Sequence, residues 1–172
     1  MSEVIAIGMA VHNNSKTLGY AIESFLSQKK LTKNFILVVS LDSCTDNSLK
    51  VVQSFLPNEK LHLLECDFNN VASNRNFINS SIRKLYPSCT LIGRLDADDE
   101  LASDDILSKI EERWQAEKFD VLIMGNYQRK NGVISDWVNL PSYDLLDEAI
   151  LLKRLKDMSK GIWKAELPSC NT

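Results

Sequence analysis

The residues best suited to chemistry are four carboxylates within positions 96–100, namely Asp96, Asp98, Asp99 and Glu100. They follow an apolar run, residues 90–93, that is typical of a buried strand. Carboxylates this close repel one another unless a cation neutralises them. Mg²⁺ is held by one or two carboxylates and keeps its other positions for water and phosphate groups, and oxygen ligands suit Mn²⁺ as well. We therefore predict that Asp98 and Asp96 bind Mn²⁺ or Mg²⁺ together with a diphosphate.

The acidic cluster is equally compatible with a solvated turn in front of a helix. A calcium-binding EF-hand loop is excluded, because its sixth position would be Leu101 rather than Gly and its twelfth Leu107 rather than Glu. The chain also lacks the glycine-rich loops of P-loop and dinucleotide-binding proteins. A diphosphate would thus have to be held in another way, and a divalent cation is the simplest one.

Polar side chains also follow two earlier apolar runs. His12 and Asn13 come directly after residues 4–11, and Asp42 comes shortly after residues 35–39. In open α/β sheets, ligands bind beyond the carboxyl ends of the strands. We therefore expect these side chains at the same edge of the sheet as the acidic cluster.

The pattern of apolar residues alternates strands with helices along most of the chain. Strands are predicted at 4–11, 35–39, 61–64, 90–95 and 121–124. Helices are predicted after a cap at Ser15, at 45–55, at 71–85, after a cap at Ser103, and at 145–155. Asn131-Gly132 predicts a hairpin within residues 127–138, whereas residues 161–172 are irregular. The fold class is thus α/β: three layers around a mainly parallel sheet, with an added antiparallel hairpin.

Composition narrows the function classes further. The chain has 172 residues, enough for one domain, and its net charge of −3 argues against nucleic-acid binding. Its first residues lack the cationic start of a signal peptide, so a cytoplasmic protein is expected. Four separated cysteines, Cys44, Cys66, Cys89 and Cys170, form no Cys-x-x-Cys pair. They are interpreted as reduced structural thiols.

Four stretches share features with one family: AVHNNSKTLGYAIESFLSQ, ILVVSLDSCTDNSLKVV, NNVASNRNFINSSI and LIGRLDADDEL. The first is similar to an opening strand, turn and helix that ends in Ser-x-x-x-Gln. The second and third are similar to an Asp-Asp-Gly-Ser-Thr-Asp turn and a Gly-x-x-x-Ala-Arg-Asn helix start. The fourth is similar to an Asp-x-Asp-Asp strand end. Together they resemble glycosyltransferase family 2, which has the GT-A nucleotide-sugar fold, over nearly the whole of residues 1–125.

The resemblance implies a nucleotide-sugar site made of His12, Asn13, Asp42, Arg75 and Asp96, and a metal site of Asp98 and Asp96. Asp42 would contact the base and His12 would flank it, while Arg75 would lie near the diphosphate. Asp96 would face the ribose or a metal-bound water, Asp98 would be the direct metal ligand, and Asp99 would support both. Without the resemblance, a half-buried neutral imidazole explains His12 and a surface charge explains Arg75.

The chain departs from the family pattern at three positions. Leu41 stands where a first Asp is usual, and Ala10 replaces a Pro or Thr. Asn70 stands at the family's Gly, where Asn can still adopt a left-handed backbone. The preferred nucleotide and sugar are therefore left open.

The resemblance also divides the chain into a donor-binding part, residues 1–126, and the start of an acceptor part, residues 127–172. The general base of the family comes from a later segment, so it is expected beyond Thr172, in a chain that is truncated there. Trp137 and Trp163 would contact sugar or pack in the core. The expected reaction is metal-dependent sugar transfer, with inversion, from a nucleotide diphosphate to a hydroxyl group.

The acceptor implied by the resemblance is a glycan or a lipid-linked molecule, at the inner face of the membrane. Peripheral membrane association and a homodimer are left open. The alternatives are a non-catalytic nucleotide-sugar-binding domain that lacks the base and a Mg²⁺-dependent phosphatase.

Overall fold

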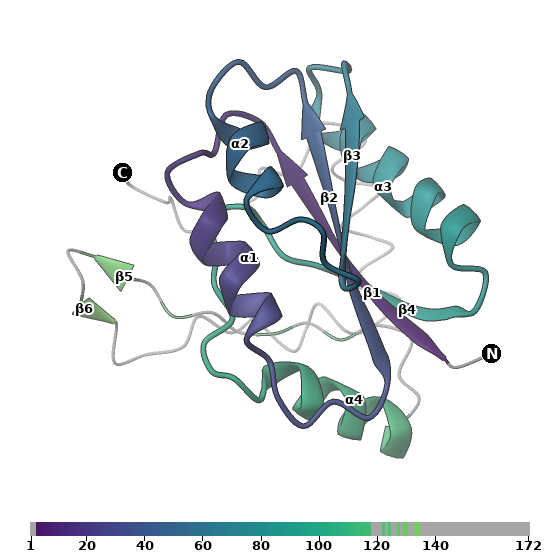
Figure 1. Ribbon diagram of the computed structural model, residues 1–172. Coiled ribbons are helices and arrows are strands. Elements are labelled where there is room, and N and C mark those ends of the chain that lie inside the picture. The colour runs from purple at the N-terminus through teal and green to yellow at the C-terminus, as the bar shows by residue number, and fades with distance from the viewer. Residues whose placement is uncertain are drawn as a thin grey trace, which may run out of the picture. The chain divides into compact units, whose positions relative to one another are not determined.

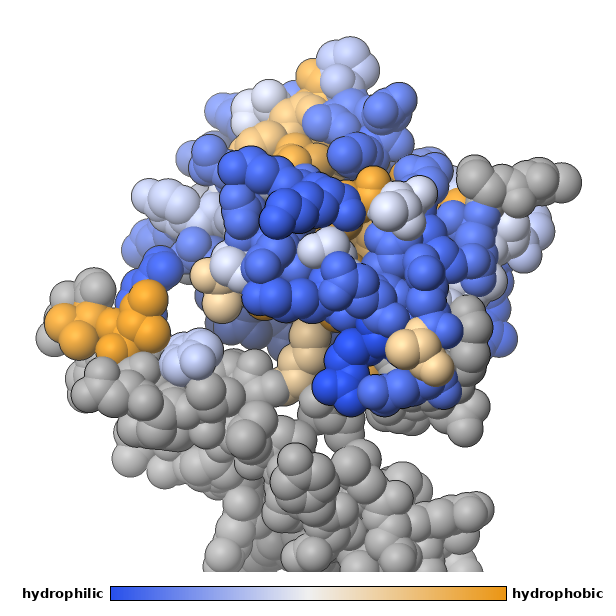
Figure 2. Space-filling model, turned by 90° about the horizontal axis from the view of Figure 1, so that it is seen from below, coloured by the Kyte–Doolittle hydropathy of each residue, from blue (hydrophilic) through white to orange (hydrophobic). Residues whose placement is uncertain are grey.

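The computed structural model describes residues 3–117 together with 122, 124, 127, 129–130 and 133–134. The chain divides into two compact units, Met1–Lys118 and Phe119–Thr172. Of the helices within the described residues, none is both long and apolar enough for a membrane crossing. Viewed from below, the described surface is largely hydrophilic, with apolar residues in small groups (Figure 2).

The first unit is built on a four-stranded sheet whose paired strands are all parallel. Its strands are β1 (Val4–Val11), β2 (Asn34–Asp42), β3 (Leu61–Cys66) and β4 (Cys89–Arg94). Their order is β3-β2-β1-β4, so the chain first moves outward from β1 and then returns to its other side. The strand order thus reverses between β1 and β4, and open α/β sheets bind ligands at the carboxyl ends of the strands near such a reversal.

Helices cover both faces of this sheet (Figure 1). They are α1 (Leu18–Leu26), α2 (Ser48–Gln53), α3 (Val71–Leu85) and α4 (Ile106–Glu117). Alternate residues of β1 and β2 face opposite ways, as strand geometry requires. One set packs in a cluster with α1, α2 and α4, and the other packs against Ile78 and Ile82 of α3. The predicted three-layer α/β arrangement with a parallel sheet is therefore confirmed.

The bounds of two helices differ from the prediction at their amino ends. Helix α1 begins at Leu18 rather than after Ser15, and a turn precedes it in which the Asn14 carbonyl accepts the amides of Thr17 and Leu18 at 3.1 and 3.0 Å. Helix α2 is shorter than residues 45–55, because the side-chain oxygen of Asn13 accepts the amides of Thr45 and Asp46. The sequence pattern places helices correctly but does not show these side-chain partners.

The predicted cap of α4 is wrong. The helix begins at Ile106, and the Ser103 hydroxyl donates to the Asp105 carboxylate instead of capping the helix. Strand β3 extends beyond the predicted residue 64 to Cys66, because it pairs with β2 as far as Asp42. In α3, the end residues Val71 and Leu85 are 57% and 44% exposed, whereas Ile78 and Ile82 are buried.

The described residues of the second unit include two short strands, β5 (Arg129–Lys130) and β6 (Val133–Ile134). They pair antiparallel in a two-stranded sheet of their own. Addition of a hairpin to the parallel sheet stays a prediction. The predicted strand at 121–124 falls partly outside the described residues. The helix at 145–155, the segment 161–172, Trp137 and Trp163 fall wholly outside them.

Candidate functional site

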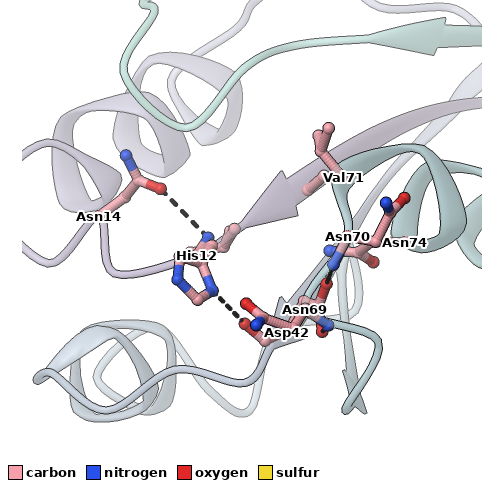
Figure 3. A pocket seen from close by; sticks show the side chains of 9 residues that line it. His12, Asn14, Asp42, Asn69, Asn70, Val71 and Asn74 are labelled. Carbon is pink, nitrogen blue, oxygen red and sulfur yellow. Dashed lines mark hydrogen bonds between the residues drawn. The ribbon is translucent and has the colours of Figure 1, made fainter.

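A pocket of about 250 Å³ lies at the carboxyl ends of β1 and β2, beside the start of α3 (Figure 3). Its lining combines apolar, amide and charged groups: Ala10, Val11, His12, Asn14, Asp42, Asn69, Asn70, Val71 and Asn74. Apolar walls with a few convergent polar groups are typical of small-molecule sites. Two of the predicted nucleotide-site residues, His12 and Asp42, therefore lie in one cavity.

Asp42 is the most strongly bound side chain of the pocket. Its side chain is 2% exposed, and its carboxylate accepts the amides of Phe68, Asn69 and Asn70 at 2.7, 2.8 and 3.0 Å. Ser43 donates a further hydrogen bond at 3.1 Å. Burial raises the pKa of this carboxyl, but the amides and Ser43 outweigh it, so the pKa lies below its ordinary value. Asp42 is therefore an anion that fixes the loop between β3 and α3.

This loop contains the left-handed residue that the sequence placed one position later. Asn69 has φ 48°, whereas Asn70 is extended, with φ −152°, and its side chain accepts the Ser73 amide at 2.9 Å. Asn70 is thus the N-cap of α3, a position that favours Asn. The expected left-handed turn survives, but with Asn69 rather than Asn70.

His12 is exposed and lies against the carboxyl end of β2. Its Nδ1 is 2.8 Å from the Asp42 carbonyl oxygen (Figure 3). A carbonyl only accepts, so Nδ1 carries the proton in this contact. The Nε2 atom lies 3.4 Å from the Asn13 amide nitrogen, a donor, which fits a neutral imidazole. The ring is therefore held at the rim of the pocket.

Asn13 does not line the pocket but joins the two loops that frame it. Its side-chain oxygen accepts the amides of Thr45 and Asp46 at 2.8 and 3.2 Å. In return, the Asp46 carboxylate accepts the amides of Ser15 and Ser48, both at 2.9 Å. Hydrogen bonds from Ser48, together with those from Ser15, lower the pKa of Asp46 despite some desolvation. The β1–α1 and β2–α2 loops are thus locked to each other.

The acidic end of β4 carries an ion-pair cluster. One oxygen of Asp96 lies 3.2 Å from Arg75 Nη2 and 3.3 Å from Arg94 Nε. Arg75 is therefore not an isolated surface charge, since it joins α3 to the end of β4. The predicted pair of Arg75 and Asp96 is brought together, and Arg94 is a cation that the sequence analysis did not single out.

The donor set near Asp98 suits a hard divalent cation. Asp98 and Asp99 are exposed carboxylates. Desolvation, followed by the charges of Asp98 and Asp96, raises the pKa of Asp99, and Arg94 partly offsets this. No cluster of three or more metal-ligating side chains occurs in the described part of the chain. Mg²⁺ needs only one or two carboxylates when phosphates and water complete its shell. These residues are therefore suitable ligands for a divalent cation. Asp98 is the better candidate, because Asp96 is already paired with Arg75 and Arg94.

Sequence reasoning did not select Asn74 as a residue of the pocket. Asn74 is 2% exposed, and its side-chain amide donates to the Ser40 carbonyl at 3.2 Å. A signal was present, because Asn70, Asn74, Ile78 and Ile82 are spaced by four residues. Residues four apart lie on the same face of a helix, so the first two are placed on the face that packs against the sheet.

Comparison with known proteins agrees with this geometry. The model of glycosyl transferase family 2 matches residues 6–169. The chain belongs to glycosyl transferase family 2. No protein of curated function matches it.

Solved structures share the fold of this family member at low identity. TarS 1–349 of S. aureus in complex with UDP-GlcNAc is 15% identical, with a TM-score of 0.59 over 85% of this chain and 38% of that chain. The mannosyltransferase PcManGT from Pyrobaculum calidifontis, in complex with GDP-Man and Mn²⁺, is 17% identical. Its TM-score is 0.53 over 66% of this chain and 32% of that chain.

A third match is a 4-diphosphocytidyl-2C-methyl-D-erythritol synthase. It is 14% identical, with a TM-score of 0.53 over 83% of this chain and 70% of that chain. The family member spans 20% of the full TarS chain and 40% of TarS 1–349.

Proposed function

We propose that this chain is the donor-binding part of a glycosyltransferase that moves a sugar from a nucleotide diphosphate to a hydroxyl acceptor. The observation that carries the proposal is the Asp42 pocket at the strand ends, in a sheet whose next strand end carries Asp96 and Asp98. Family membership favours sugar transfer over phosphate hydrolysis.

The pocket has the chemistry to hold a nucleobase. The Asn70 amide donates to Oδ2 of Asp42, and a carboxylate oxygen can accept a second hydrogen bond. A ring N–H of uracil, thymine or guanine can supply it, whereas adenine and cytosine lack such a group. His12 at the rim offers a flat face beside the base, as the resemblance implies.

A divalent cation would be held by Asp98, with Asp99 and Asp96 close by. When bound, it would supply positive charge to the diphosphate as that group leaves. The guanidinium groups of Arg75 and Arg94 already lie at Asp96 and add positive charge to the same region. Metal dependence and inversion are part of the proposal.

The acceptor side of the reaction needs a general base, a carboxylate that takes the proton of the attacking hydroxyl. Neither the pocket nor the Asp96 cluster offers one, because Asp42 is proposed to bind the nucleobase and Asp96 is paired with Arg75 and Arg94. The base is therefore proposed to come from residues outside those that the structure describes. A glycan or lipid-linked acceptor, a cytoplasmic location at the membrane face and a homodimer remain parts of this proposal.

Calorimetric titration with UDP, GDP and dTDP, with and without Mn²⁺, tests the donor site. We expect one nucleotide to bind, more tightly with Mn²⁺, and Asp98→Asn to remove the effect of the metal. Glu59→Gln is the matched control, because Glu59 is an exposed carboxylate just before β3, at the opposite edge of the sheet. Failure of all three nucleotides to bind would overturn the proposal.

A further inference from the structure

Gln28 is a buried polar residue near the end of α1 that the proposed function does not use. Its side chain is 6% exposed. Its amide nitrogen donates to the carbonyls of Ser103 and Ser24 at 2.7 and 3.0 Å, and its amide oxygen accepts the Leu107 amide at 3.0 Å. Both ends of the side-chain amide are thus engaged, on both sides of the start of α4.

Ser24 lies one helical turn before Gln28 and holds the same part of the chain. Its hydroxyl accepts the Leu101 amide at 3.1 Å and donates to the Ala21 carbonyl at 2.8 Å. Because the Gln28 side-chain amide also donates to the Ser24 carbonyl, the two residues form one contact surface at the end of α1. This surface holds the segment 101–107 near both of its ends.

The segment 101–107 continues directly from the acidic strand end. The Asp99 amide donates to the Asp96 carbonyl at 3.1 Å and so forms a turn. Only Glu100 lies between Asp99 and Leu101. The strand end is therefore anchored on one side by β4 and on the other by Ser24 and Gln28. The direction in which Asp98 and Asp99 leave the sheet is set by these two anchors.

Docking of α4 alone does not need Gln28. Further along the helix, the buried Glu111 accepts the Thr32 amide at 3.1 Å and also the Thr32 hydroxyl. Hydrophobic residues Leu107 and Ile110 of α4 pack in the core as well. Gln28 instead satisfies a backbone amide in the first turn of α4, which no residue within the helix can bond.

We propose that Ser24 and Gln28 are positioning residues that hold Asp98 and Asp99 in the arrangement that a divalent cation requires. The cation itself rests on the proposed function. Residues that orient metal ligands from outside the site commonly change metal affinity by roughly 10- to 100-fold when they are replaced. Residues at the end of α1 would thereby change the metal affinity of a site that lies about seventy positions later in the sequence.

The variant Gln28→Met tests this, because Met has a similar length but no amide. Hydrogen–deuterium exchange, without any ligand, should become faster in peptides that span 96–107, while exchange in β1 and β2 stays unchanged. Mn²⁺ alone, followed by the EPR signal of the free ion, should bind roughly tenfold or more weakly than to the wild type. Ser24→Ala is a milder second variant, for use if Gln28→Met does not fold.

Thr32→Val is the matched control, because it weakens the docking of α4 without touching segment 101–107. It should lower the thermal unfolding temperature but leave both the exchange of 96–107 and the Mn²⁺ affinity near the wild-type values. Unchanged exchange of 96–107 in both Gln28→Met and Ser24→Ala would overturn the inference. Faster exchange with unchanged Mn²⁺ affinity would also overturn it. Absence of Mn²⁺ and nucleotide binding in the wild type would count against the proposed function instead.

Discussion

At the scale of single residues, Asp42 is the side chain on which the candidate site depends most. Replacing it by Asn would turn one acceptor oxygen into a donor that faces backbone amides. A hydrogen bond to a charged group contributes about 1.5–3 kcal/mol, and a buried donor without a partner is destabilising as well. We expect Asp42→Asn to lower the free energy of unfolding by about 2–4 kcal/mol, measured by urea denaturation.

Asp67→Asn is the control for that measurement. Asp67 is an exposed carboxylate two residues before Asn69, and it accepts the Ser43 hydroxyl at 2.6 Å. Its replacement should change the free energy of unfolding by less than about 1 kcal/mol, because surface positions contribute little. Equal losses in the two variants would mean that the amide contacts of Asp42 are not what stabilises the loop.

Some of the site residues could be predicted from the sequence and others could not. The sequence analysis selected four residues for the nucleotide-sugar site from their places at strand ends and in motifs: Asp42, His12, Arg75 and Asp96. It placed Arg75 and Asp96 in one site but did not predict that the two side chains form an ion pair. The role of Asn13 could not be predicted, because the amides that it accepts belong to residues about thirty positions later.

At the scale of elements, the packing of α3 on β1 depends on a glycine. A Cβ atom added to Gly8 would lie 2.6 Å from Cγ2 of Ile78, closer than real contacts allow. Because Ile78 is β-branched, its Cγ2 cannot turn away easily. We expect Gly8→Ala to lower the free energy of unfolding by about 1–3 kcal/mol in urea denaturation.

Gly19→Ala provides the opposite expectation. The added Cβ would lie 3.7 Å from Val51, an ordinary contact, and Gly19 lies within α1. Alanine is the better helix former by about 1 kcal/mol, so this variant should be as stable as the wild type or more so. A loss of stability in Gly19→Ala equal to that in Gly8→Ala would contradict the role of close packing.

Element boundaries were the least predictable part of the fold. Apolar periodicity located all four helices and four strands of the first unit, because it reports which residues face the core. The starts of α2 and α4 depend instead on partners that are distant in sequence. Asn13 takes the amides before α2, and Gln28 takes an amide of α4. Ser103 is of a residue type that often caps helices, and the sequence does not show that the Gln28 side chain accepts an amide of α4 instead.

At the scale of the whole molecule, the strand order decides which polar residues meet. In the order β3-β2-β1-β4, the parallel strands β2, β1 and β4 are neighbours, so their carboxyl ends lie at one edge of the sheet. The alternation of strands and helices predicts a parallel sheet but not this order. Only the pairing of β1 with both β2 and β4 brings the pieces of the candidate site to one edge.

The stability of the whole chain should fall in acid. The pKa values of Asp42 and Asp46 are lowered in the folded state, so as the pH falls the unfolded chain takes up their protons first. The stabilisation is therefore complete above about pH 4, the ordinary range for Asp, and decreases as the pH falls further. Asp99 acts in the opposite direction, because its pKa is raised. Since Asp104 also has a lowered pKa, we expect the carboxylates with lowered pKa values to dominate.

Urea denaturation between pH 6 and pH 2.5 measures this dependence, and added salt separates its sources. Asp104 pairs with Lys29 at the surface, where salt screens the attraction. Asp42 is buried and held by backbone amides, so its contribution should persist at high salt. We expect the free energy of unfolding to depend less steeply on pH in Asp42→Asn than in the wild type, at both low and high salt. If high salt abolished the pH dependence of the free energy of unfolding, the acid sensitivity would come from surface ion pairs and not from Asp42.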